Sequence, residues 1–148
     1  MFSSFDVNAS GMTAQQYRMD VISENVANAN TTRTADGTPY VRKVVTFAQK
    51  GDQTPFSRVL NTSRNSYSGY SGEGVTVSGV HEDTASGANL AYDPSHPDAD
   101  ENGYVTYPNV NIVTEMTNLI DASRAYEANA TAFSASKTIM MKGLEIGR

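Results

Sequence analysis

The sequence predicts an α+β protein whose long N- and C-terminal helices form an antiparallel coiled coil beside a small β-rich, loop-rich central region. Apolar residues recur every seven positions near both ends of the 148-residue chain, and a sustained heptad repeat is typical of helices that pack in a coiled coil. The middle lacks this period and is rich in turn-forming residues. We therefore expect three segments, at residues 1–32, 33–108 and 109–148.

The first expected element is a helix from about residue 5 to residue 29. Ser3 or Ser4 is expected to cap it, with Asp6 in its first turn, where a carboxylate suits the helix dipole. Gly11 interrupts this helix at a cost of about 1 kcal/mol relative to alanine, which predicts the close approach of another backbone. The apolar heptad positions are Phe5, Met12, Met19, Ile22, Val26 and Ala29.

The central region is expected to contain short strands joined by turns and loops. Apolar residues predict three strands, at residues 40–47, 75–80 and 103–107. Glycine, proline and aspartate predict turns at 36–39 and 92–103. Residues 50–74 are polar and are expected to form a long mobile loop.

The last expected element is a helix from about residue 111 to residue 141, capped by Asn109 or Asn111 and ended by Gly143. At 1.5 Å per residue it would be roughly 45 Å long. Its heptad positions are Ile112, Met116, Leu119, Tyr126, Ala130, Phe133, Met140 and Leu144. Val113 and Ile120 flank these positions and make the apolar stripe too wide for one partner helix.

The unequal lengths of the two helices predict assembly. The N-terminal helix can cover only part of the C-terminal one, so the remaining apolar surface is expected to contact other copies or other proteins. An ordinary helical hairpin over a small sheet is the alternative. The expected assembly interface consists of Phe5, Met12, Met19, Ile22, Asn25, Val26, Asn28, Ile112, Met116, Leu119, Ile120, Arg124, Tyr126, Ala130, Phe133, Met140 and Leu144.

Polar residues in this interface have two interpretations each. Asn25 and Asn28 either lie at the surface or fix the register between helices, as buried amides do in coiled coils. Arg124 either pairs locally with Asp121 and Glu127 or reaches across to Asp20 or Glu24 of the first helix.

The charge is divided along the central region. The net charge of −5 argues against a nucleic-acid partner. Residues 33–64 contain six basic and two acidic residues, whereas residues 65–108 contain seven acidic residues and no lysine or arginine. Both charged segments could simply be surfaces exposed to solvent. Alternatively, Arg33, Arg42 and Lys43 make lateral contacts with the acidic half of a neighbouring copy, since such complementarity sets partner and register.

The residues favour no catalysis and no cofactor. His81 and His96 lack the partners of a catalytic triad, and the chain has no cysteine for a disulfide or a thiolate metal site. Residues 98–103 match the first half of a calcium loop, but Asn109 stands where the bidentate glutamate belongs. A structural turn is the better account. A secreted calcium-dependent binding module remains the alternative function.

Neither a cleaved secretory signal nor membrane insertion is expected. The first positive charge is Arg18, which follows Asp6, and the N-terminus has no apolar core. The hydrophobic content is 39 %, and no apolar run approaches the ~18 residues that span a bilayer.

Several motifs resemble those of bacterial flagellar rod and hook proteins. Ala9-Ser10-Gly11-Met12, Arg18-Met19-Asp20-Val21 and residues 24–31 are similar to the N-terminal signature of the family, and residues 115–116 and 123–129 to its C-terminal signature. Residues 32–43, 92–105 and 108–111 resemble the proximal rod type. A distal rod or hook-type relative is the alternative, which the short length and the Asp36–Lys43 region disfavour.

The resemblance implies a structural subunit of the proximal rod, which polymerises through its terminal helices and transmits motor torque across the periplasm. It implies export through the flagellar type III apparatus without a cleaved signal. The implied partners are other copies of the chain, other rod proteins, the adaptor at the rod base, the export gate and the surrounding rings. The implied location is the periplasmic rod of the basal body.

Overall fold

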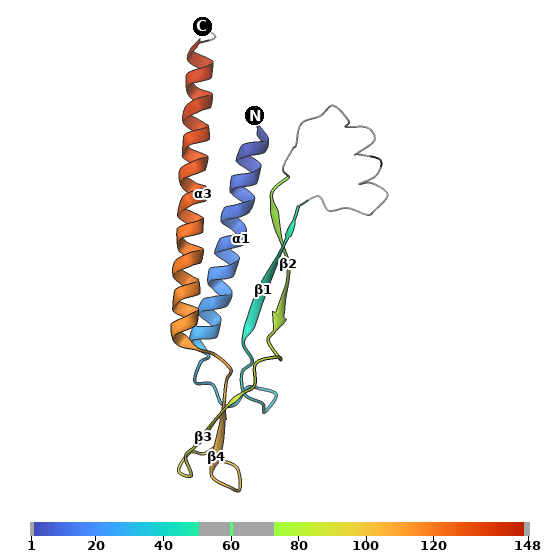
Figure 1. Ribbon diagram of the computed structural model, residues 1–148, viewed down its shortest axis with the longest axis vertical. Helices are drawn as coiled ribbons and strands as arrows, with labels where there is room; N and C mark the ends of the chain where they lie inside the picture. The colour runs from blue at the N-terminus through green and yellow to red at the C-terminus, as the bar shows by residue number, and fades with distance from the viewer. Residues whose placement is uncertain (1, 51–59, 61–72, 147–148) are drawn as a thin grey trace. The chain divides into compact units, whose positions relative to one another are not determined.

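The computed structural model describes residues 2–50, 60 and 73–146 (Figure 1). Its elements are helix α1 (Phe2–Ala27), strands β1 (Lys43–Gln49), β2 (Val75–Glu82), β3 (Asn89–Tyr92) and β4 (Tyr104–Tyr107), and helix α3 (Ile112–Ile146). Two long terminal helices with strands between them confirm the predicted α+β class. Among the described helices, none combines the length and the apolar character needed to cross a membrane.

The chain divides into two units, and each takes segments from both ends of the sequence. Unit 1 comprises Met1–Gln16, Phe47–Ser78 and Ser123–Arg148, and unit 2 comprises Tyr17–Thr46 and Gly79–Ala122. Both units therefore contain part of α1 and part of α3. They cut across the three segments expected along the sequence, whose status as domains stays a prediction.

The two helices run antiparallel, as predicted. In unit 1 the ring of Phe5 packs edge-on against that of Phe133, with the centroids 4.9 Å apart, and Gly11 lies against the side chain of Asn129. Residue numbers thus rise along α1 as they fall along α3. In unit 2 the pairing continues in the same sense, because Asn25 contacts Glu115.

Four signals were expected at the helix ends: a serine cap and Asp6 at the start of α1, an asparagine cap at the start of α3, and a stop at Gly143. Only the asparagine cap is observed. Because α1 already begins at Phe2, Ser3 and Ser4 lie inside the helix instead of capping it, and Asp6 lies beyond its first turn. The cap of α3 is confirmed, since Oδ1 of Asn111 accepts hydrogen bonds from the backbone N–H groups of residues 113 and 114. The predicted stop at Gly143 is wrong. One glycine costs only about 1 kcal/mol, and strong helix formers surround it.

Strands β1 and β2 form an antiparallel two-stranded sheet. At one end of the sheet the N–H of Asp83 donates to the carbonyl of Arg42. At the other end the N–H of Lys50 donates to the carbonyl of Gly74. β1 begins three residues later than predicted, because the N–H of Tyr40 bonds to Thr31 and that of Arg42 to Asn109 instead of to a strand. Most of the mobile loop expected at 50–74 lies outside the described residues.

Strands β3 and β4 form a second antiparallel sheet, the β3–β4 ribbon. Its register pairs Asn89 with Tyr107 and Tyr92 with Tyr104. The predicted strand at 103–107 is confirmed as β4, whereas β3 was not expected. Its sequence, Asn-Leu-Ala-Tyr, is short and has no β-branched residue, so its pairing with β4 decides its conformation.

The turns carry the expected geometry. Gly37 and Gly103 have φ angles of 80° and 81°, values that favour glycine. In the turn that closes the ribbon, Oδ1 of Asp100 accepts hydrogen bonds from the N–H groups of Asn102 and Tyr104. These bonds agree with a structural turn at residues 98–103.

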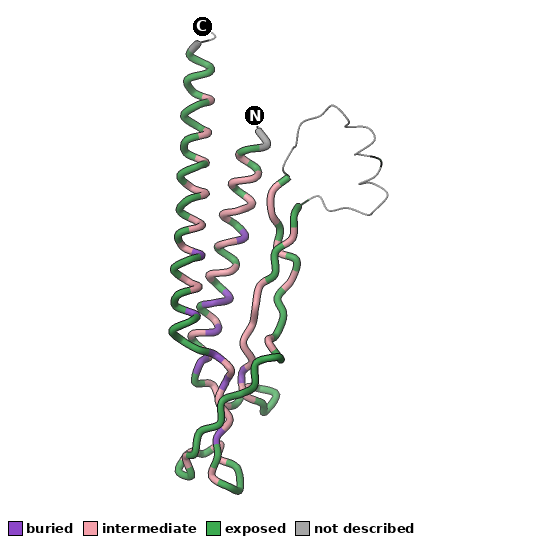
Figure 2. The backbone as a smooth tube through the Cα atoms, in the orientation of Figure 1, coloured by how far each residue is buried: buried purple, intermediate pink, exposed green. Residues whose placement is uncertain are grey.

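The apolar core lies almost entirely in unit 2 (Figure 2). Its buried apolar residues are Val21, Ile22, Ala29, Tyr40, Val105, Val110 and Ala122. In the described part of unit 1, Ala14 is the one buried apolar residue. The helices of unit 1 therefore carry apolar side chains that unit 1 itself covers only in part.

Candidate assembly surfaces and a buried polar junction

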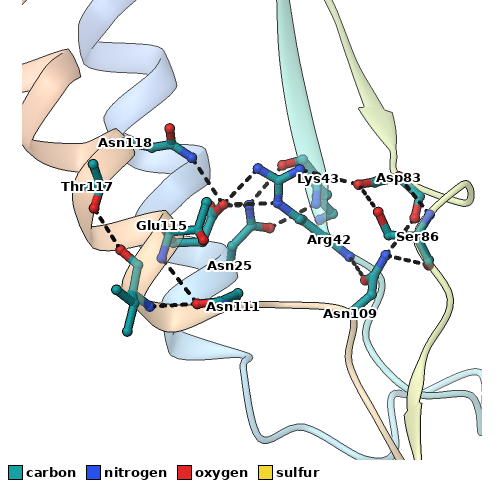
Figure 3. A network of polar contacts seen from close by, with 12 residues as sticks. Asn25, Arg42, Lys43, Asp83, Ser86, Asn109, Asn111, Glu115, Thr117 and Asn118 are labelled. Atoms are coloured by element: carbon teal, nitrogen blue, oxygen red, sulfur yellow. Dashed lines mark hydrogen bonds and ion pairs between the residues drawn. The ribbon is translucent and has the colours of Figure 1, made fainter.

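A fully buried amide joins three segments of unit 2 (Figure 3). The side chain of Asn25 has no exposed surface. Its Nδ2 donates to the carbonyl of Lys43 at 2.8 Å and to Oε2 of Glu115 at 3.0 Å. Its Oδ1 accepts from the hydroxyl of Tyr40 and the N–H of Lys43, both at 2.9 Å. Both donors and both lone pairs of this amide are therefore used.

A charged pair lies beside this amide. Glu115 is only 1 % exposed, and its Oε1 accepts from Nε of Arg42 at 2.9 Å and from Nη2 at 2.8 Å. The remaining nitrogen, Nη1, bonds to Oδ2 of Asp83 at 3.3 Å. A carboxylate this deeply buried is stable only when it is paired and hydrogen-bonded, as here.

Asn109 fixes the outer side of the junction. Its Oδ1 accepts from the N–H of Arg42 at 2.8 Å, and its Nδ2 donates to the carbonyls of Asp83 and Ser86. Ser86 in turn donates to the carboxylate of Asp83 through its N–H and its hydroxyl. Asn109 thus ties the residue before β1 and the residues after β2 to the linker that precedes α3 (Figure 3).

Burial and charge shift the pKa values of three of these groups. Burial, and then the nearby Glu24 and Glu115, raise the pKa of Tyr40 to about 12. Burial alone would lower the pKa of Arg42, but its bonds to Glu115 and Asp83 outweigh this and raise it. The bonds from Ser86, more than that from Arg42, lower the pKa of Asp83. At neutral pH the hydroxyl of Tyr40 is therefore protonated, while Arg42 and Asp83 carry opposite charges.

The three cations expected to make lateral contacts are placed within their own unit. Arg42 bonds Glu115 and Asp83, as described, and Nζ of Lys43 pairs with Glu24. Arg33 pairs with Asp98 at 3.7 Å while its side chain is 68 % exposed. Of the three, Arg33 keeps the most surface for a neighbour, and the lateral contacts stay a prediction.

The first two turns of α3 carry an exposed apolar stripe. Ile112, Met116 and Ile120 are 43 %, 54 % and 51 % exposed, and Val113 beside them is 75 % exposed. The spacing of four residues forms a ridge of the kind that packs into the groove of another helix. On the buried side of these turns lie Glu115 and Ala122. Ile112 and Met116 therefore face away from the junction, although they occupy heptad positions.

The C-terminal end of α3 extends beyond α1 in unit 1 (Figure 1). Because Phe5 lies beside Phe133, the first residue of α1 is level with about residue 136 of α3. About ten residues, or roughly 15 Å of helix, continue past that point. Ile139, Met141 and Leu144 on this end are 67 %, 56 % and 75 % exposed.

The other residues of the expected interface are mostly less exposed than the stripe and the protruding end of α3. Ile22 and Asn25 are buried and Arg124 is exposed. The half-buried ones are Phe5, Met12, Met19, Val26, Asn28, Leu119, Tyr126, Ala130, Phe133 and Met140. Of these, Phe5 and Phe133 contact each other across the two helices, and the role of the whole set as an assembly interface stays a prediction.

The sequence did not reveal the junction as a whole. Asn25 was expected to fix register, but its partners Tyr40 and Glu115 were not identified, nor were Asp83 and Asn109. One signal for a buried carboxylate was available. Glu115 lies one turn after the capping Asn111, on the side of α3 that faces α1. Within the described ranges, no cluster of three or more histidine or acidic side chains could hold a metal ion.

Two family matches define the class of this protein. Residues 5–33 match the family described as "Flagella basal body rod protein". Residues 101–146 match the one described as "Flagellar basal body rod FlgEFG protein C-terminal". The matched segments contain α1 and α3, the elements that carry the exposed and half-buried apolar surface. The class is therefore that of the flagellar rod proteins.

Full-length relatives narrow this class. The chain is 49 % identical to the flagellar basal-body rod protein FlgC of Bacillus subtilis, over 99 % of the chain and 98 % of the relative. It is 44 % identical to FlgC of Borreliella burgdorferi and 37 % identical to FlgC of Salmonella typhimurium, over at least 97 % of each protein. The chain belongs to the FlgC family of proximal rod proteins. It is thus a structural component of the flagellar basal body and not an enzyme.

Proposed function

We propose that this chain builds the proximal rod by packing α1 and α3 against the same helices of neighbouring subunits, and that the resulting tube transmits motor torque across the periplasm. The observation that carries this proposal is the apolar surface that one chain leaves uncovered. The stripe at the start of α3 and its protruding end are exposed, and the described part of unit 1 buries one apolar side chain, Ala14. Contacts of this kind, repeated over many neighbours, resist slipping under torque.

The proposed neighbours are other copies of the chain, other rod proteins, the adaptor at the rod base and the surrounding rings. We further propose that the chain reaches them through the export gate of the flagellar type III apparatus, without a cleaved signal. The absence of cysteine agrees with transport as an unfolded chain, in which a free thiol would be a liability. The exposed Arg33 is the cation best placed for a lateral contact with an acidic neighbour.

The exposed stripe provides the test. Met116→Asp and Ile120→Asp place a charge on a surface that is exposed in one chain, so the chain should still fold and be exported. Assembly should fail, because the charge would be buried without a partner between subunits. We expect loss of swimming and loss of the chain from purified hook–basal bodies, with the variant still detected among exported proteins.

Thr114→Asp is the matched control. Thr114 is exposed on the same two turns, but it lies on another side of α3 from the Met116 ridge. This variant should swim normally, and an aspartate at this position also suits the start of a helix. Normal rods in both Met116→Asp and Ile120→Asp would contradict assembly through this stripe.

A further inference from the structure

The β3–β4 ribbon of unit 2 has an exposed face that the helices do not explain. The register places Leu90, Tyr92 and Tyr104 on one face and Val105 on the other. Val105 is fully buried, whereas Leu90, Tyr92 and Tyr104 are 70 %, 67 % and 46 % exposed. The rings of Tyr92 and Tyr104 pack edge-on, 5.3 Å apart. The ribbon thus buries Val105 in its own unit and presents a pre-formed aromatic face outward.

This face lies beside uncompensated negative charge. The turn that closes the ribbon is held to it by bonds between Asp93 and Gly103 and between Asp100 and Tyr104. Asp100 and Glu101 are exposed and make no ion pair among the described contacts, whereas Asp83, Asp98 and Glu115 of the same unit are paired with arginines. Arg33 reaches Asp98 but bonds neither Asp100 nor Glu101 among the described contacts. A partner of this face therefore needs apolar and positively charged groups together.

The protruding end of α3 has that combination. Met141 and Leu144 supply exposed apolar side chains, and the exposed Lys137 lies on the same face of the helix, four residues before Met141 and seven before Leu144. No residue of α1 extends far enough to cover this end, as described above.

We propose that the aromatic face of the ribbon in one subunit binds the protruding end of α3 in a second copy of this chain. The aromatic rings cover Met141 and Leu144, while Glu101 pairs with Lys137. The two surfaces are different, so the contact is heterologous and repeats from copy to copy without closing on itself, as a rod requires. This inference rests on the proposed assembly of copies, to which it adds a specific pair of surfaces.

Cross-linking in cells tests the contact directly. Because the chain has no cysteine, Glu101→Cys and Lys137→Cys can be introduced into separate, co-expressed full-length copies and treated with a short bismaleimide. We expect a linked peptide pair that contains positions 101 and 137, identified by mass spectrometry from isolated basal bodies. The control pairs are Glu101→Cys with Thr131→Cys and Thr114→Cys with Lys137→Cys, whose added sites are exposed elsewhere on α3.

Charge exchange supplies a second readout. Lys137→Glu and Glu101→Lys should each lower the yield of assembled rods by about fivefold, the scale of one exposed ion pair replaced by repulsion. The double variant, which restores opposite charges between copies, should recover most of that yield. A general effect on folding or export would instead be additive.

Two results would overturn the inference: 101–137 cross-linking no higher than in the control pairs, or cross-linking of position 101 to a different protein. Neither result would affect the proposed rod function as long as the chain is found in rods and Met116→Asp removes it. Loss of that Met116 effect would count against the proposed function even if the cross-link formed.

Discussion

At the scale of single residues, the most consequential side chain is Asn25. A buried amide is tolerated only when its hydrogen bonds are satisfied, and each of the four that Asn25 can make is present. These bonds need Tyr40, the backbone of Lys43 and Glu115 in one arrangement. Shifting α1 by one residue along α3 would leave the amide and the carboxylate unpaired. The polar junction therefore specifies register more strongly than apolar contacts do.

Asn25→Asp tests this account with almost no change in shape. The substitution replaces two donors by an oxygen that faces the carboxylate of Glu115 and the carbonyl of Lys43. We expect the free energy of unfolding to fall by about 3–5 kcal/mol, the scale for an unpaired buried charge. Urea unfolding of the full chain at neutral pH measures it.

The control for that substitution is Asn28→Asp. Asn28 is only half-buried, and its Nδ2 makes one hydrogen bond, to the carbonyl of Glu24. The expected loss is about 1 kcal/mol. Equal losses in the two variants would mean that the junction contributes no more than a surface amide.

The identity of these bonds could not be predicted from the sequence. The sequence left open whether Asn25 lies at the surface or fixes register, and its complete burial agrees with the second interpretation. Its partners lie 15 to 90 residues away, and no local pattern links an asparagine to a glutamate at that distance. The heptad also assigned Ile112 and Met116 to the contact between helices. The structure buries Glu115 in their place, because the charge of Arg42 compensates it there.

At the scale of elements, the periodicity of the sequence predicted both helices and their antiparallel pairing, since a 3.5-residue repeat depends only on neighbours along the chain. It failed at Ser3, Ser4 and Gly143, where caps and stops compete with strong helix formers nearby. It also missed β3, which exists because β4 pairs with it.

Gly11 shows how one element constrains the other. A Cβ at this position would lie 2.9 Å from Oδ1 and 3.1 Å from Cγ of Asn129. The sequence predicted close approach of another backbone here, and the structure places the Asn129 side chain there instead. That side chain is held by its own bond to the carbonyl of Ala125 at 2.8 Å. The glycine thus gives up helix stability to let α3 approach.

A double-mutant cycle measures the constraint. Gly11→Ala alone should destabilise the chain or leave it unchanged, because the gain of about 1 kcal/mol in helix propensity is opposed by displacement of Asn129. In an Asn129→Ala background the same change should stabilise the chain by up to about 1 kcal/mol. Thermal or urea unfolding of the four proteins gives the coupling. The same effect of Gly11→Ala in both backgrounds would show that Asn129 imposes no constraint.

At the scale of the whole molecule, burial is unequal between the two units. Unit 2 has an apolar core and the polar junction, whereas the described part of unit 1 buries one apolar side chain, Ala14. Most of the favourable free energy of burial in an isolated chain therefore belongs to unit 2. Unit 1 gains its share when neighbours cover its helices.

Hydrogen exchange on the isolated chain should reveal this inequality. Backbone amides of residues 17–27 and 115–122 should exchange more slowly than those of residues 5–14 and 125–140, because opening unit 1 exposes less buried surface. Since each helix contributes to both groups, each provides its own internal comparison. Uniform protection along α1 and α3 would contradict the account. In assembled rods the difference should shrink.

The polar junction also has a kinetic consequence. Its bonds join residues 73 and 90 positions apart, so Asn25 and Arg42 have no buried partner until the segment around Glu115 is present. Contacts this distant in sequence are slow to form, because a long loop must close before they give any stabilisation. Most of the chain must therefore be present before unit 2 can fold. In the export that we propose, through a narrow channel, this delay keeps the leading residues extended until the last helix arrives.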